Sequence, residues 1–161
     1  AIRFVNEQAF GQPQEADIID ALRQSCDDLL SLVALHQGQV VGHILFSPAT
    51  ISHGKDGMHG VGLAPLAVLP AYQRQGIGSK LVETGLGILR ERSTPFVIVL
   101  GHAEYYPRFG FERASRHGIL CQWQGVPDEA FMILVNDVEA FQDVHGVAYY
   151  RAEFDAAVTN E

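Results

Sequence analysis

The feature that most constrains the fold is the apolar run Met58 to Leu69 (MHGVGLAPLAVL). Turn residues bound it, and it is shorter than the roughly 18–20 residues that a membrane-spanning helix needs. Such a run is typical of a β-strand that is covered on both faces. The loop Gln73 to Gly78 (QRQGIG) then leads into Gly76 to Arg92, where apolar residues recur at helical spacing. The sequence therefore predicts a strand, a tight loop and an amphipathic helix in succession.

Shorter patterns predict the other elements. We expect strands at 2–5, 29–36, 40–47, 95–100, 119–123, 130–135 and 147–154, a helix at 15–25, and one or two helical turns at 105–109. Several antiparallel strands are thus followed by a strand–helix–strand–helix–strand order. This order predicts an α+β (mixed α/β) fold, with helices flanking one central, twisted, mostly antiparallel sheet.

Composition limits the functional classes. The chain has 161 residues, 47% of them hydrophobic, which predicts a single globular domain over 1–161. It has 11 basic and 19 acidic residues, a formal charge of −8 that argues against a nucleic-acid binder and is compatible with a cationic substrate. Cys26 and Cys121 form no disulfide framework or zinc motif, so we expect no metal. No membrane span or signal peptide is visible in the sequence, so we expect no membrane partner and a cytoplasmic location.

The loop before the helix has the properties of an anion-binding site. The first N–H groups of a helix lack intrahelical partners, and the helix dipole adds positive potential there. Gly76 and Gly78 would let a ligand approach the backbone closely. Neither a P-loop nor a full dinucleotide fingerprint is present, because the third glycine position of the latter is Leu81. From the loop alone, a tight turn without a ligand is an equally good interpretation.

A second motif changes this balance. Residues 104–111 read EYYPRFGF, so that Tyr106, Gly110 and Phe111 form a Y-x-x-x-G-F pattern. Upstream, Gln73, Gly76 and Gly78 form Q-x-x-G-x-G. With both motifs in this order, the region from about Val61 to Phe111 resembles the GCN5-related N-acetyltransferase (GNAT) family. The resemblance implies a GNAT-like single domain with a splayed strand pair.

The resemblance also implies a set of residues that bind acetyl-CoA as cosubstrate. In the family, the pyrophosphate binds to the loop amides, and the pantetheine arm hydrogen-bonds to the backbone of the preceding strand. The matching loop residues are Gln73, Arg74, Gln75, Gly76, Ile77, Gly78 and Ser79, and the matching strand residues are Leu66, Ala67 and Val68.

Tyr106 matches the tyrosine that serves as general acid in the family. A phenol with a pKa near 10 can protonate the departing CoA thiolate at neutral pH. The alternative is that Tyr106 only packs in the core. No acidic residue lies in VGLAPLAV, the strand on which many family members carry a base. His59, His102, Glu104 or a water chain remain as candidates for the base. The family often has Asn after the next strand, where this chain reads Leu100-Gly101-His102.

The resemblance therefore predicts an N-acetyltransferase, an acyltransferase that moves acetyl to a primary amine by direct attack. The acceptor would be a small-molecule or peptide amine, and the C-terminal strands could pair in a homodimer. The missing strand carboxylate keeps an alternative open, namely a sensor or regulatory module that binds CoA or acyl-CoA without efficient acetyl transfer.

Overall fold

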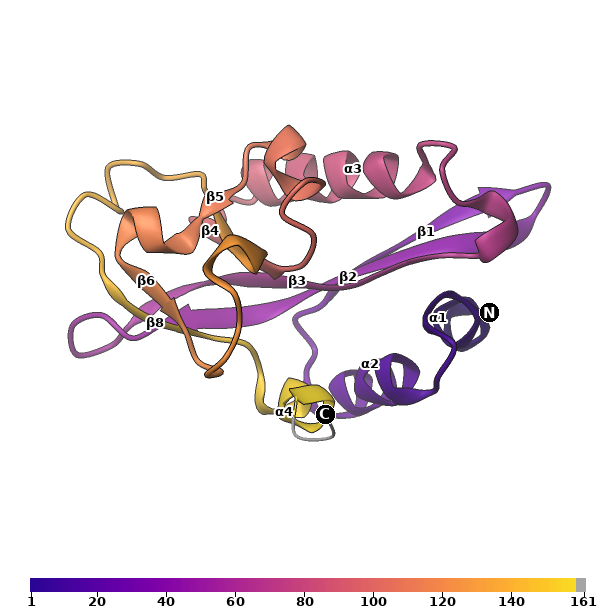
Figure 1. Ribbon diagram of the computed structural model, residues 1–161, viewed down its shortest axis with the longest axis horizontal. Coiled ribbons are helices and arrows are strands. Elements are labelled where there is room, and N and C mark those ends of the chain that lie inside the picture. The colour runs from indigo at the N-terminus through magenta and orange to yellow at the C-terminus, as the bar shows by residue number, and fades with distance from the viewer. Residues whose placement is uncertain (159–161) are drawn as a thin grey trace. The chain divides into compact units, whose positions relative to one another are not determined.

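The computed structural model describes residues 1–158 as four α-helices and eight strands, joined by short 3₁₀ segments (Figure 1). The helices are α1 (Ile2–Phe10), α2 (Gln14–Ser25), α3 (Ile77–Glu91) and α4 (Asp155–Val158). The strands are β1 (Leu30–His36), β2 (Gln39–Ile51), β3 (Met58–Val68), β4 (Phe96–Leu100), β5 (Glu112–Arg113), β6 (Ile119–Cys121), β7 (Phe131–Val135) and β8 (Gly146–Tyr149). The 3₁₀ segments are η1 (Pro70–Tyr72), η2 (Tyr106–Phe109), η3 (Ala114–His117), η4 (Asp128–Ala130) and η5 (Ala152–Phe154).

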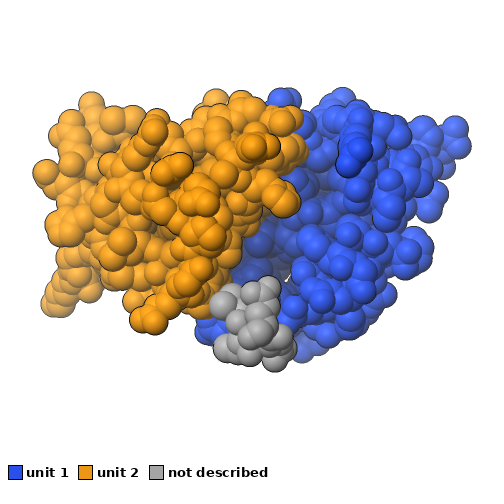
Figure 2. Space-filling model, viewed as in Figure 1, with its two compact units in different colours: residues 1–47, 64–87, 152–161 blue, residues 48–63, 88–151 orange. Residues whose placement is uncertain are grey.

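The chain divides into two compact units (Figure 2). Unit 1 comprises 1–47, 64–87 and 152–161, and unit 2 comprises 48–63 and 88–151. The strand order is β5-β7-β4-β3-β2-β8-β6, with β1 paired to β2. Strands β2 and β3 each continue from one unit into the other. The mixture of helices with one sheet confirms the predicted α+β class. The single domain over 1–161 stays a prediction, and its last three residues, 159–161, lie outside the described part of the chain.

In unit 1, helices cover both faces of the sheet. Figure 1 shows α3 above β1 and β2, and α1 and α2 below them. Strands β1 and β2 pair antiparallel from Leu30↔Phe46 to His36↔Gln39. The central residues of β2, from Val41 to Ser47, are all buried, as expected of a strand with helices on both sides.

In unit 2, the paired strands run in both directions. Strand β4 pairs antiparallel with β7 from Phe96↔Val135 to Leu100↔Phe131. It also pairs parallel with β3, where the register covers Val61↔Val97, Gly62↔Ile98 and Leu63↔Val99. Strand β3 itself continues to Val68. Strand β8 pairs antiparallel with β2 and parallel with β6.

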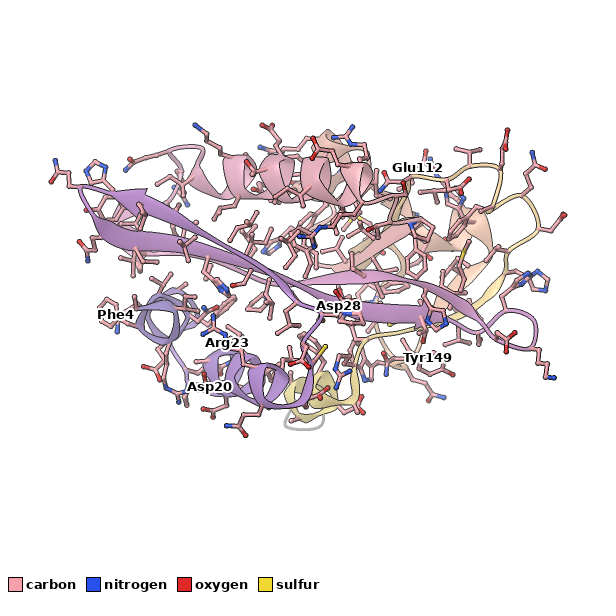
Figure 3. The ribbon with its side chains drawn as sticks, turned by 180° about the vertical axis from the view of Figure 1, so that it is seen from behind. Phe4, Asp20, Arg23, Asp28, Glu112 and Tyr149 are labelled. Carbon is pink, nitrogen blue, oxygen red and sulfur yellow. The ribbon has the colours of Figure 1, made fainter. Side chains whose placement is uncertain are left out.

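The predicted strand at Ile2–Val5 is wrong, because these residues begin helix α1. Four alternating residues are too few to separate a period of 2 from a period of 3.6. Val5 is fully buried, whereas Phe4 is 53% exposed and points away from the sheet (Figure 3). Arg3 bridges Glu7 on its own helix at 2.9 Å, and on α2 it reaches Asp17 at 2.6 Å and Asp20 at 2.7 Å. The ion pairs of Arg3 join α1 to α2, whereas Val5 packs with Val41 and Ala67 of the sheet.

The C-terminal prediction is partly wrong. The apolar run 147–154 was expected to form one strand, but β8 ends at Tyr149 and a 3₁₀ segment follows from Ala152. This segment and α4 pack on α2 within unit 1. The side chain of Ser25 donates to Glu153 at 2.7 Å, and that of Gln14 donates to the carbonyl of Ala156 at 2.9 Å.

Candidate functional site

The end of β3 is fixed by a small apolar core in unit 1. Ala67 is buried together with Val5, Val41 and Leu69. The amide of Leu69 donates to the carbonyl of Val41 on β2 at 2.9 Å. Leu66 and Val68, on the opposite face of β3, are half-buried. The side chain of Ala67 thus belongs to the core, and those of its two neighbours are partly covered.

Gln73, the first residue of the glycine motif, ties the loop to the end of this strand. Its side-chain amide Nε2 donates to the carbonyl of Val68 at 2.9 Å. Gln75 Nε2 makes a longer bond, of 3.4 Å, to the carbonyl of Ala71. A glutamine at the start of the motif thus holds the strand end and the loop in one arrangement.

The loop that follows has an unusual backbone. Arg74 has φ of 62° and Gly76 has φ of 84°, so two positions of the loop are left-handed. Such a conformation is ordinary for glycine and uncommon for arginine. A Cβ added at Gly76 would meet no atom within 4 Å, so the backbone there borders open space. A ligand can therefore approach this peptide group without a steric barrier.

Helix α3 begins directly after Gly76, and its first turn faces the same loop. The carbonyl of Gly76 accepts from the amide of Lys80 at 3.0 Å, which is the first bond of the helix. The amides of Ile77 and Gly78 precede that bond, so helix geometry gives them no intrahelical acceptor. Their N–H groups and the helix dipole give this end a positive potential. The loop and helix start are chemically suited to a phosphate group.

A residue that sequence reasoning missed, Gly42 on β2, lets α3 pack closely. A Cβ at this position would lie 3.1 Å from side-chain atoms of both Ile77 and Leu81. It would also lie 3.3 Å from the Cβ of Ala34. The only sequence signal was a glycine inside an apolar strand pattern, which can mark a close approach of another element.

Tyr106 lies in unit 2, at the start of η2. Its ring makes edge contacts with Tyr105 and Phe111, at centroid distances of 5.1 and 5.7 Å. A Cβ at Gly101 would overlap the ring, so glycine is required just after β4. Gly110 ends η2 in a left-handed conformation, and Phe111 is buried. The side chain of Tyr106 is 8% exposed, so one orientation of the phenol is enforced by packing.

Burial raises the pKa of the Tyr106 phenol well above its usual value, and the nearby Tyr105 raises this pKa further. A desolvated phenolate is disfavoured because burial removes the water that would stabilise its charge. Tyr106 therefore keeps its proton through the neutral range. It can act as a proton donor but is a poor base.

A hollow of about 500 Å³ lies beside Tyr105 in the same unit. It is lined by His102, Ala103, Glu104, Tyr105 and Arg108. The guanidinium of Arg108 lies 4.7 Å from the centroid of the Tyr105 ring, in cation–π contact. Two of the three candidate bases, His102 and Glu104, thus line one hollow. The third, His59, is an exposed residue near the start of β3.

The aromatic side chains between residues 131 and 150 differ in burial. Phe131, Phe141 and Tyr150 are buried in unit 2, whereas Tyr149 is 43% exposed. Burial raises the pKa of the Cys121 thiol, which makes it a poor nucleophile. Among residues 1–158, no three metal-ligating side chains gather in one place. No helix in that range is long and apolar enough to cross a membrane.

Comparison with known proteins identifies the family of this chain. The sequence pattern of the acetyltransferase (GNAT) domain family matches residues 2–114. The chain is 37% identical to the Escherichia coli protein named uncharacterized N-acetyltransferase YhbS, over 92% of this chain and 87% of YhbS. The chain therefore belongs to the GNAT family and is an acyltransferase by class.

A second curated relative is more similar over a shorter stretch. The chain is 48% identical to the uncharacterized N-acetyltransferase YjhQ of E. coli over 113 residues. This stretch makes up 69% of the present chain and 62% of YjhQ, so the chain spans less than two thirds of that relative.

Two solved structures share the fold. The crystal structure of E. coli YhbS in complex with CoA has a TM-score of 0.86 and 36% identity, and the match covers 96% of this chain and 84% of that one. A GNAT family acetyltransferase from Brucella melitensis in complex with acetyl-CoA has a TM-score of 0.74 and 38% identity, with 96% and 90% covered. These likenesses confirm the predicted GNAT fold.

Proposed function

We propose that this protein transfers the acetyl group of acetyl-CoA to a primary amine. The observation that carries the proposal is the loop after β3, with its open backbone at Gly76 and the start of α3 next to it. Relatives with 36% and 38% identity have been solved with CoA and with acetyl-CoA bound. The loop of the present chain is suited to a phosphate group, which supports the proposal that this chain binds acetyl-CoA as well.

The residues that would hold acetyl-CoA are those of the two adjoining segments in unit 1. Backbone amides in the loop Gln73, Arg74, Gln75, Gly76, Ile77, Gly78 and Ser79 would bind the pyrophosphate. The backbone of Leu66, Ala67 and Val68 would bind the pantetheine arm. When bound, acetyl-CoA supplies an acetyl thioester, which an amine can attack. The Gln73–Val68 hydrogen bond would keep the two segments in a fixed relation.

Tyr106 would supply the proton that the CoA sulfur takes up when its bond to the acetyl carbon breaks. Its burial keeps the phenol protonated, and its ring contacts limit its motion. General-acid catalysis requires a donor that is protonated and held at a fixed position. Because the Tyr106 pKa lies well above 10, the rate should not fall through loss of this proton at any pH below 10.

An ammonium acceptor must lose a proton before it attacks. His102 and Glu104 line one hollow, so we propose that one of these two side chains accepts the proton. A water chain or His59 is the alternative. Comparing the pH–rate profiles of His102→Gln, Glu104→Gln and His59→Gln tests these assignments. Loss of the acidic limb in one variant identifies the base, and three unchanged profiles favour water.

The net charge of the chain bears on the chemistry of the acceptor. The formal charge of −8 favours a cationic small-molecule or peptide amine over an anionic substrate. A homodimer and a cytoplasmic location stay predictions. The lack of a carboxylate in residues 61–68 supports a second candidate function, a sensor that binds acyl-CoA without efficient transfer.

Calorimetric titration with acetyl-CoA tests the proposal, with ATP and NAD as controls for general phosphate binding. We expect micromolar binding of acetyl-CoA and no comparable binding of the two controls. Release of CoA across a panel of amines then separates the two candidates. Binding with release supports the enzyme, binding without release supports the sensor, and no binding overturns both.

The variant Tyr106→Phe tests the proton donor. It keeps the ring contacts with Tyr105 and Phe111 and removes only the hydroxyl. We expect kcat to fall about 100-fold or more, the size typical of general-acid catalysis, with acetyl-CoA affinity nearly unchanged. Tyr105→Phe, which alters the neighbouring phenol, is the matched control. An unchanged kcat in Tyr106→Phe would remove this residue from the mechanism.

A further inference from the structure

A second buried phenol in unit 2, that of Tyr150, has no role in the proposed reaction. Tyr150 directly follows β8 and is 6% exposed. Its hydroxyl donates to the carbonyl of Leu63 at 3.1 Å and, more weakly, to that of Ile98 at 3.4 Å. Leu63 belongs to β3 and Ile98 to β4. One hydrogen is thus shared between the main chains of two adjacent parallel strands.

These two carbonyls lie where the β3–β4 register ends. Its last pairs are Gly62↔Ile98 and Leu63↔Val99. Strand β3 continues beyond Leu63 toward Leu66–Val68, the segment assigned above to the pantetheine arm. A hydroxyl that bonds to both strands at this point fixes the backbone from which that segment departs.

The position of the Tyr150 ring is determined from several sides. The ring stacks on Trp123 with a centroid distance of 5.6 Å and an interplanar angle of 21°. The backbone amide of Tyr150 donates to Gln122 Oε1 at 2.6 Å. A Cβ at Gly62 would overlap the ring and would lie 2.7 Å from its Cδ1. The Tyr150 hydroxyl is therefore held in one position.

The Tyr150 hydroxyl is also a permanent donor. Burial raises the pKa of this phenol far above its ordinary value, and the Tyr106 phenol raises it further. The bond to Leu63 consequently persists at every pH at which the protein would be assayed. Two main-chain carbonyls would lose their shared donor if the hydroxyl were removed.

We propose that Tyr150 is a positioning residue for acetyl-CoA: by joining the carbonyls of Leu63 and Ile98, it fixes the course of β3 into Leu66–Val68. The inference rests on the proposed function, because it takes that segment as the pantetheine site. It assigns Tyr150 no contact with the reacting atoms.

The test compares Tyr150→Phe with Tyr149→Phe. The first variant keeps the ring and removes the hydroxyl, and the second removes a hydroxyl from the neighbouring side chain, which is 43% exposed (Figure 3). In Tyr150→Phe we expect the acetyl-CoA Kd and KM to rise about fivefold to tenfold, the effect of losing one buried hydrogen bond. The KM for the amine and kcat should stay within about twofold. Tyr149→Phe should match the wild type.

A purely structural role would give a different result, namely a lower melting temperature with an unchanged acetyl-CoA Kd. That result overturns the proposal. A wild-type chain that does not bind acetyl-CoA overturns the proposed function, and the role of Tyr150 with it. If Tyr150→Phe does not fold, Gly62→Ala supplies the same test, because its Cβ would displace the ring while the hydroxyl remains in the chain. A folded Gly62→Ala with wild-type affinity would equally contradict the proposal.

Discussion

His43 is a titratable residue buried completely in the middle of β2. Its Nδ1 lies 3.1 Å from Asn6 Nδ2 on α1, and its Nε2 lies 3.0 Å from Ser31 Oγ on β1. Because Asn6 Nδ2 can only donate, His43 Nδ1 accepts and His43 Nε2 carries the proton. Burial, together with the charge of Arg23 on α2, lowers the His43 pKa to about 4. The neutral imidazole is thus part of the packing of α1 on the sheet.

The His43 pKa predicts how stability depends on pH. In the unfolded chain this histidine takes up a proton below about pH 6.5, whereas in the folded chain it does so only near pH 4. The stabilisation is complete above pH 6.5 and decreases as pH falls toward 4, by about 3 kcal/mol in all. Denaturant unfolding at several pH values measures this loss. His43→Gln cannot titrate, so its stability should fall less steeply over the same interval, and parallel curves would contradict the prediction.

The sequence revealed the motif residues but not their neighbours. Gln73, Gly76 and Tyr106 could be named because each occupies a fixed place in a short pattern. His43 could not, because a histidine inside the apolar run VVGHILFS has the same local signal whether it is buried or paired with a ligand. Tyr150 belongs to no such motif. Its hydrogen bonds to Leu63 and Ile98 join residues far apart in sequence, and no local pattern predicts such contacts.

At the scale of the element, two glycines of α3 provide a matched pair. Gly85 lies against Phe46 of β2, and a Cβ there would overlap the ring. Gly87, two residues later, has nothing within 4 Å of an added Cβ. Both glycines lie in the helix interior, where glycine costs about 1 kcal/mol relative to alanine.

Alanine at these two positions should therefore have opposite effects. Gly87→Ala should stabilise the protein by about 0.5–1 kcal/mol, a rise in Tm of about 1–4 °C. Gly85→Ala should destabilise it by about 1–3 kcal/mol, because Phe46 is fully buried and cannot move aside easily. Thermal unfolding followed by circular dichroism measures both changes. Equal shifts in the two variants would show that the contact with Phe46 does not limit the packing of α3.

Several elements were predicted close to their observed bounds, whereas two apolar runs were assigned to the wrong kind of element. The helix predicted at 15–25 is observed as Gln14–Ser25, and the strand at 95–100 as Phe96–Leu100. The N-terminal run Ile2–Val5 was too short for its period to be determined, and as part of α1 it buries Val5 and forms ion pairs from Arg3 to α2. The end of β8 was missed because the apolar run continues through η5, where Phe154 is buried without belonging to a strand. Tertiary contacts decide both cases.

At the scale of the whole molecule, the chain alternates between its two units. It crosses from one to the other after residues 47, 63, 87 and 151. Two of these crossings lie inside continuous strands, β2 and β3. Because β2 and β3 form hydrogen bonds in both units, unfolding of either strand in one unit also weakens its pairing in the other unit. The topology therefore favours one cooperative transition and the predicted single domain.

Two spectroscopic signals can test this cooperativity in the intact protein. Helices α1 and α2 lie wholly in unit 1, as does most of α3, so the helical circular dichroism reports mainly on that unit. The single tryptophan, Trp123, lies in unit 2 and stacks on Tyr150, so its fluorescence reports on the other unit. We expect urea unfolding curves from the two signals to coincide in midpoint and slope. Acetyl-CoA at about 100 times its Kd should raise both midpoints together, by about 2.7 kcal/mol of stability. If the curves separate, or if the ligand moves only the circular dichroism curve, the two units unfold independently and the single-domain prediction is wrong.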